Sequence, residues 1–512
     1  MVTKIILLVV FFAVMIGVGV YARKSTTSVD GFVLGGRSVG PWLTAFAYGT
    51  SYFSAVVFVG YAGQFGWKYG LASTWIGVGN ALIGSLLAWV ILGRRTRVMT
   101  HHLDSKTMPD FFGARFDSKT LKIVASAICF IFLVPYTASV YNGLSRLFGM
   151  AFDIPYATCV MVMALITAVY VIIGGYMATA INDFIQGIIM LFGIVAVIGA
   201  VLSGQGGFIE AIRKMAEIPS DVELTLGQPG AFTSFFGPDP LNLLGVVILT
   251  SLGTWGLPQM VQKFYAIKDE KAINTGTIVS TLFAVVISGG CYFLGGFGRL
   301  FDNEAIYNPE TGAVIYDSIV PFMLSKLPDI LIGIVVVLVL SASMSTLSSL
   351  VMTSSSTLTL DFLKDNFIKD MDEKKQVRIM RVLIVFFIVL SVVIAMDPPT
   401  FIAQLMGISW GALAGAFLAP FLYGLYWKGV TKAAVWASFA AGVGITVANM
   451  FWKFIASPIN AGAIAMIAGL IIVPIVSLVT PKMNKAKVDE IFECYEETVT
   501  IKKSHSLEAR AK

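Results

Sequence analysis

Long apolar segments dominate this chain and restrict what it can fold into. A helix that crosses a lipid bilayer needs about 20 predominantly apolar residues, and segments of that length follow one another along the sequence. Only 13% of the 512 residues are charged, whereas soluble proteins carry about 25%. We therefore predict an all-α integral membrane protein. Its transmembrane helices, about thirteen by the length criterion, are expected at 3–21, 42–64, 71–92, 123–147, 156–175, 182–203, 241–262, 273–296, 329–357, 382–396, 401–426, 433–452 and 460–480.

Lys and Arg are distributed unevenly between alternate connecting segments. Most of the 36 lie on one side of the membrane if the N-terminus is outside, and such residues concentrate on the cytoplasmic side. We therefore predict a multi-pass protein of the plasma membrane with its N-terminus outside and its C-terminus in the cytoplasm. Segment 3–21 is expected to remain as a helix, because no A-x-A-like cleavage site follows it. Residues 1–480 should form a single transmembrane domain, and 481–512 a cytoplasmic tail.

Charge and side-chain chemistry exclude several classes of function. The net charge of +6 comes from short basic clusters between apolar segments, so a nucleic-acid partner is not expected. The four cysteines have no paired spacing, which argues against a disulfide framework or a zinc site. The three histidines fall in predicted cytoplasmic segments, and the chain is not expected to be an enzyme. A channel would show a charged ring or a repeated filter motif, whereas a transporter-derived solute sensor stays open as an alternative.

Two of the expected membrane helices are interrupted. Segment 47–55 is a series of small, hydroxyl and aromatic residues, and segment 250–259 contains two glycines and a proline that remove helical support. They belong to the second and seventh expected helices, which run in opposite directions. Secondary transporters built from inverted repeats bind ions and solutes where such broken helices meet. Close packing of helices around glycine is the alternative explanation.

Hydroxyl residues are concentrated in the ninth expected helix, at 341–349. Ala342, Ser345, Thr346 and Ser349 share one helical face. Two hydroxyls on one turn, together with carbonyls of a nearby unwound helix, would supply the hard oxygen ligands that sodium needs. Serine and threonine also hold transmembrane helices together by hydrogen bonds, which is the alternative.

Asp183 is the notable acidic residue within the expected helices, near the start of 182–203. A buried carboxylate in a membrane indicates a functional role, because burial without a partner is costly. A solvated aspartate that caps a helix N-terminus explains the same position equally well.

Three sequence motifs resemble the sodium:solute symporter family, which includes bacterial sodium/proline symporters. They are Gly-Gly-Arg-Ser-Val-Gly-Pro at 35–41, Ile-Gly-Gly-Tyr at 173–176 with Asp183 and Gln186 downstream, and Met-Ser-Thr-Leu-Ser at 344–348. The resemblance covers nearly the whole chain and implies a LeuT-like core of two inverted five-helix repeats, at about 42–203 and 241–426. It also implies sodium-coupled import of an amino acid such as proline, or of a small carboxylate, by alternating access. Related proteins of this fold carry sugars, sialic acids or pantothenate, so these solutes stay open.

The resemblance also implies ligand sets within the bilayer, with sodium and a small solute as the partners of the chain. The shared sodium site would use the carbonyls of Thr50, Phe53 and Ala342 with the hydroxyls of Ser345 and Thr346. A second sodium site, as in sialic acid transporters, would use Asp183, Ser345, Ser348 and Ser349.

Residues of the two interrupted helices are the candidates for solute contact. Proline-transporting relatives have an aspartate where this chain has Tyr52, which argues against proline as the solute. Lys263 is placed near the inner end of its helix and is not expected to be a ligand. The candidates are Tyr48, Ser51, Tyr52, Ser54, Thr254, Trp255, Gln259 and Gln404.

Overall fold

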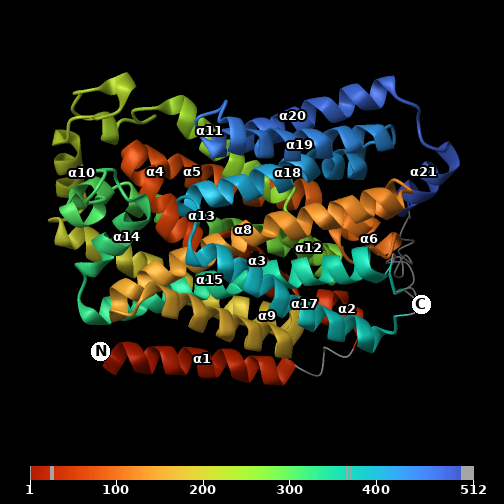
Figure 1. The fold of residues 1–512 in the computed structure, drawn as a ribbon, viewed down its shortest axis with the longest axis horizontal. Coiled ribbons are helices and arrows are strands. Elements are labelled where there is room, and N and C mark those ends of the chain that lie inside the picture. Colours follow the sequence, from red (N-terminus) through yellow and green to blue (C-terminus); the bar gives the residue numbers. More distant parts are fainter. Residues whose placement is uncertain (1, 23–27, 365–366, 369–370, 497–512) are drawn as a thin grey trace, which may run out of the picture.

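The structure, a computed structural model, describes residues 2–22, 28–364, 367–368 and 371–496. Every regular element within these ranges is a helix, which confirms the all-α prediction (Figure 1). The only strand-like pairing in the described chain consists of two isolated bridges, Val39 with Ile267 and Tyr307 with Val314. Most of the long helices lie side by side along one common direction, as expected for membrane-spanning segments (Figure 1).

The first half of the chain contains the first predicted interruption. α3 ends at Tyr52, where Phe53 turns to an extended conformation (φ −110°, ψ 94°), and helical structure resumes at Ala55. The helices of this half are α1 (Val2–Ala22), α2 (Val29–Leu34), α3 (Pro41–Tyr52), α4 (Ala62–Tyr69), α5 (Thr74–Gly79), α6 (Arg94–His102), α7 (Met108–Arg115), α8 (Lys119–Phe152), α9 (Tyr156–Gly204) and α10 (Phe208–Glu217). Wider π-helical turns cover Val56–Tyr61, Asn80–Leu87 and Trp89–Gly93.

The second half contains the other predicted interruption. A short turn, Gly253–Trp255, follows α11, and Leu257 is extended (φ −87°, ψ 120°) before Pro258 opens α12. Proline is tolerated at this first helical position because the N–H it lacks would have no partner there. The helices of this half are α11 (Pro240–Leu252), α12 (Pro258–Ala266), α13 (Glu270–Gly295), α14 (Tyr316–Ser325), α15 (Asp329–Thr357), α17 (Glu373–Met396), α18 (Ile402–Tyr426), α19 (Lys432–Trp452), α20 (Pro458–Val479) and α21 (Lys485–Phe492).

The described chain contains 11 helical stretches that are long and apolar enough to cross a membrane. This confirms a multi-pass protein, but it does not confirm about thirteen spans. The two counts differ at two places: the broken second expected helix, and the first part of the kinked α9. Residues 56–102 count as one stretch that holds the end of the second expected helix and all of the third. Tyr156–Val169 is a shorter apolar helix, and Gly175 (φ 57°, ψ −164°) kinks α9 just beyond it.

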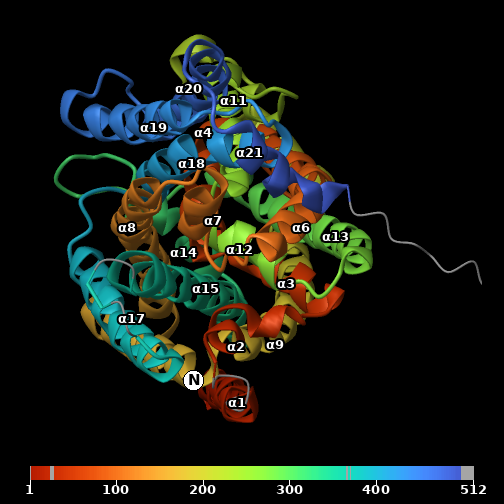
Figure 2. The same ribbon diagram turned by 90° about the vertical axis from the view of Figure 1, so that its right-hand side faces the viewer.

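α15 lies at the centre of the helical bundle. It contacts α3, α8, α9, α12 and α17, and Figure 2 shows α15 surrounded by these helices when the bundle is viewed end on. All of its residues from Leu338 to Thr357 are buried. α1, by contrast, exposes the apolar side chains of Ile5, Ile6 and Val9, as a helix at the lipid boundary would. The hydroxyl-rich segment of α15 is therefore isolated from lipid and faces other helices.

Candidate functional site

The first interruption meets α15 through hydrogen bonds to backbone carbonyls. The Ser345 hydroxyl donates to the Thr50 carbonyl at 2.9 Å, and the Thr346 hydroxyl lies 3.3 Å from the carbonyls of Thr50 and Ser51. Both hydroxyls also lie close to the Ala342 carbonyl, at 3.0 and 3.1 Å. The last carbonyls of a helix have no partner within that helix, so the end of α3 presents carbonyl oxygens that the α15 hydroxyls can bond.

These contacts bring together most of the predicted sodium ligands. Thr50, Ala342, Ser345 and Thr346 form one buried oxygen cluster that sits between the end of α3 and the middle of α15. Phe53 is the first residue after α3; its ring stacks on that of Tyr52 with centroids 4.2 Å apart. Backbone carbonyls and hydroxyls are hard oxygen donors, so this cluster has the chemistry that sodium requires.

A second polar cluster lies next to the first, around Ser349. The Ser51 and Ser349 hydroxyls are 2.8 Å apart, and the Lys263 ammonium donates to the Ser349 hydroxyl at 2.9 Å. Ser348 donates to the Ser345 carbonyl at 2.9 Å. Asp183 is fully buried, and neither of its carboxylate oxygens has a hydrogen-bond partner in the described chain.

The structure bears on two residues of this region that the sequence left open. Asp183 is not a solvated cap, because it lies inside α9 and none of its surface is exposed. Lys263, placed by the sequence near the inner end of its helix, is 2% exposed, and its ammonium donates to the Ser349 hydroxyl. The missed signal is the polar face formed by Gln259, Gln262 and Lys263, which recur at helical spacing on α12.

Several of the predicted solute contacts converge on Gly84. The Tyr48 hydroxyl donates to the Gly84 carbonyl at 2.7 Å, and the Thr254 hydroxyl donates to the same carbonyl at 3.1 Å. The Trp255 ring nitrogen donates to the Ile83 carbonyl at 3.0 Å. The Tyr52 hydroxyl is so close to Gly84 that a Cβ there would lie 2.2 Å from it. The two interrupted helices thus meet across the third expected helix.

The other candidates lie in different surroundings. Ser51 belongs to the Ser349 cluster, and Ser54 accepts a hydrogen bond from the Val56 N–H at 3.2 Å. The buried Gln259 amide has no partner within the described residues. Gln404 lines a separate cavity at one end of the bundle.

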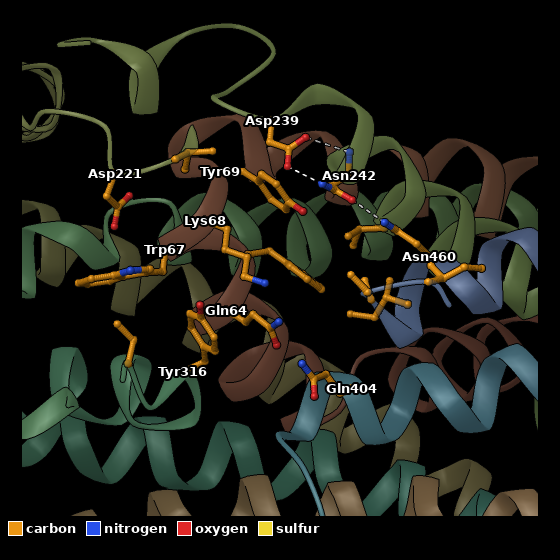
Figure 3. A pocket seen from close by; sticks show the side chains of 18 of the residues that line it. Gln64, Trp67, Lys68, Tyr69, Asp221, Asp239, Asn242, Tyr316, Gln404 and Asn460 are labelled. Atoms are coloured by element: carbon orange, nitrogen blue, oxygen red, sulfur yellow. Dashed lines mark hydrogen bonds between the residues drawn. The ribbon is translucent and has the colours of Figure 1, made fainter. Parts of the chain in front are cut away.

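This end cavity has a volume of about 610 Å³. Its wall includes Gln64, Lys68, Tyr316 and Gln404, which surround the space in Figure 3, together with Asp221 and Asp239 from the long segment 204–240. The opposite end of the bundle is held together by polar contacts. There, Arg37 donates to the Ser105 carbonyl at 2.8 Å, Lys106 pairs with Asp30 at 3.0 Å, and Val39 bridges to Ile267.

Comparison with known proteins identifies the family. The profile of the sodium:solute symporter family matches residues 32–442. The chain belongs to this family. The sodium/proline symporter of Staphylococcus aureus (strain JH9) is 30% identical over 496 residues, covering 94% of this chain and 92% of the relative. The osmoregulated proline transporter OpuE of Bacillus subtilis (strain 168) is 28% identical over 487 residues, covering 94% of this chain and 95% of the relative. This family member is a membrane transporter that couples sodium to a solute, and it is not an enzyme.

Solved structures show the same fold. A Na+-coupled sialic acid symporter in a substrate-bound outward-open state has a TM-score of 0.76 at 17% identity, covering 94% of this chain and 99% of the other. Mhp1, a nucleobase-cation-symport-1 family transporter, has a TM-score of 0.54 at 13% identity, covering 90% and 97%. The LeuT-like fold implied by the sequence motifs is confirmed.

Proposed function

We propose that this symporter binds its coupling sodium where the end of α3 meets α15. The observation that carries this proposal is the pair of α15 hydroxyls, Ser345 and Thr346, against the Thr50 carbonyl. A sodium ion ligated by these oxygens, by the Ala342 carbonyl and by the Phe53 carbonyl would tie the interrupted helix to the centre of the bundle. This sodium-bridged contact would stabilise one conformation of the transporter. Its loss on sodium release would permit the conformation that opens to the other side of the membrane.

The sodium gradient supplies enough free energy to concentrate a solute. One charge that crosses 100 mV contributes about 2.3 kcal/mol, and a roughly tenfold sodium gradient adds about 1.4 kcal/mol. A single ion per cycle therefore supports accumulation of several hundredfold. The membrane potential and the sodium gradient favour import over export.

The solute is a small amino acid or carboxylate that binds beside Gly84. The two relatives are named as proline transporters, whereas Tyr52 argues against proline itself, so a small molecule similar to proline is proposed. The region around Gly84 presents hydroxyl and indole groups from Tyr48, Tyr52, Thr254 and Trp255, which suit hydrogen bonding to a small polar molecule. The Tyr52 hydroxyl reaches the Thr250 carbonyl and links the two interrupted helices directly. A solute that inserts between these groups would replace their hydrogen bonds to the carbonyls of Gly84, Ile83 and Thr250.

Residues 1–480 form a single transmembrane domain of the plasma membrane. The N-terminus faces the outside, and the C-terminal tail 481–512 faces the cytoplasm. The distribution of Lys and Arg supports this orientation. The end cavity then opens to the outside, because segment 204–240 contributes to its wall. The contacts of Arg37 and Lys106 would then lie at the cytoplasmic end.

A thermal-shift screen with and without sodium identifies the solute. Proline, small monocarboxylates, pantothenate, a hexose and sialic acid are each added to the purified protein. The true solute should raise the melting temperature more in sodium than in choline, because the two ligands stabilise the same state. A solute that stabilises equally in both salts would contradict coupling between the sites.

A further inference from the structure

A lysine side chain contacts the residue set that would hold a second sodium ion. Lys263 is buried on α12, and its ammonium donates to the Ser349 hydroxyl at 2.9 Å. Ser349 and Asp183 are two of the ligands expected for that second ion. A sodium ion and an ammonium group compete for the same kind of partner, since both bind hydroxyl and carboxylate oxygens.

Lys263 and Asp183 act on each other electrostatically, and both are buried. The Lys263 ammonium also lies 5.2 Å from the centroid of the Tyr176 ring. Tyr176 and Asp183 are two helical turns apart after the kink at Gly175, so they share one face of α9. The ammonium therefore lies along the face that carries the carboxylate.

The Lys263 ammonium connects α12 to α15, the helix whose serines would bind the second sodium ion. Lys263 contacts Ser349 on α15, and Ser349 contacts Ser51 at the end of α3 at 2.8 Å. α12, α15 and α3 are thereby joined through one chain of hydrogen bonds, close to the oxygen cluster of Ser345 and Thr346.

From these contacts we infer that the Lys263 ammonium is a built-in cation that fills the second sodium site, so that this chain binds one sodium ion and not two. The carboxylate of Asp183 balances one positive charge, which Lys263 already supplies. A second sodium would place two like charges in a buried space with a single counter-charge, which is unfavourable in a low-dielectric interior. The inference rests on the proposed function, because the remaining ion is the one assigned to Thr50, Ser345 and Thr346.

Direct binding of radioactive sodium-22 to the purified protein tests this inference without knowledge of the solute. The wild type should bind one sodium ion per chain. Lys263→Gln removes the charge but keeps a group that can donate to Ser349, and it should bind two. Lys263→Arg keeps the charge and is the matched control, which should bind one. The double variant Lys263→Gln/Asp183→Asn removes the counter-charge as well and should return to one.

The outcomes separate this inference from the proposed function. Two ions bound by the wild type would overturn the inference alone, and this measurement needs no variant that might fail to fold. One ion bound by both the wild type and Lys263→Gln would also overturn it, because Lys263 would then not be what excludes the second ion. Binding of no sodium by the wild type would contradict the proposed sodium site itself.

Discussion

Single residues connect the interrupted helices to the rest of the bundle. Ser345 and Thr346 share a helical face, and the structure places both against the Thr50 carbonyl. The contact of Lys263 with Ser349 was not predicted, because counting residues from the end of a helix does not show which way its side chain points. The break at Leu257 and the start of α12 at Pro258 turn Lys263 toward α15.

Gly84 is the residue whose substitution should most selectively disturb the proposed solute site. In Gly84→Ala the new Cβ would lie 2.2 Å from the Tyr52 hydroxyl, so the Tyr52 ring must move. We expect the KM for the solute to rise by about tenfold, which corresponds to the binding free energy of one hydrogen bond. Uptake kinetics in proteoliposomes would measure this change.

Gly199→Ala is the matched control for this substitution. Gly199 lies in α9, and a Cβ there would meet no atom within 4 Å. Its KM should equal that of the wild type. An unchanged KM in Gly84→Ala would show that the solute binds elsewhere.

At the scale of helices, close contacts between backbones fix how the first repeat packs on the second. A Cβ at Gly66 in α4 would lie 1.9 Å from the Gly295 carbonyl oxygen in α13, and one at Gly295 would lie 2.2 Å from the Ala62 carbonyl oxygen. Small residues permit such approaches in membrane proteins. The sequence showed many glycines, but it could not show which of them face another helix.

Gly66→Ala should therefore destabilise the bundle. The added methyl group meets backbone, which cannot rotate away, and overpacking of this kind costs about 1–3 kcal/mol. A loss of unfolding free energy of this size should lower the melting temperature of the purified protein by several degrees. Gly289→Ala, on α13 in open space, should leave it unchanged; equal melting temperatures for both variants would refute the close contact.

The junction of α14 with α18 should depend on pH. Burial raises the pKa of Asp317 to about 6 from an ordinary value of 3.8, although Arg146 opposes the shift. The Asp317 carboxylate accepts a hydrogen bond from the Ile402 N–H at 3.2 Å, at the start of α18. Because the pKa is raised, the folded protein holds the proton more tightly than the unfolded chain between about pH 4 and 6.

The free energy of unfolding should consequently decrease by up to about 3 kcal/mol as the pH rises from about 4 to 6. Above that range this contribution should stay constant. Asp317→Asn has no such proton and should lose this slope. Melting temperatures of the wild type and the variant at a series of pH values give the comparison. Parallel curves for the two proteins would mean that Asp317 does not titrate in this range.

For the molecule as a whole, the sequence predicted the fold class and both helix interruptions, because these depend on local properties. The length of an apolar segment identifies a membrane helix. Glycine residues and Pro258 weaken a helix whatever its neighbours in the bundle are. The number of spans was less secure, since the kink at Gly175 and the break after Tyr52 change where one helix ends. The electrostatic partner of Asp183 could not be predicted, because it comes from a helix distant in sequence.

The sodium dependence of solute uptake in proteoliposomes tests the central claim most directly. The wild type should show saturable uptake that requires an inward sodium gradient. Ser345→Ala/Thr346→Ala keeps a helix-compatible residue at both positions but removes two proposed ligands, so half-maximal uptake should need at least about tenfold more sodium. Uptake by the double variant with the sodium dependence of the wild type would contradict the assignment of sodium to this site.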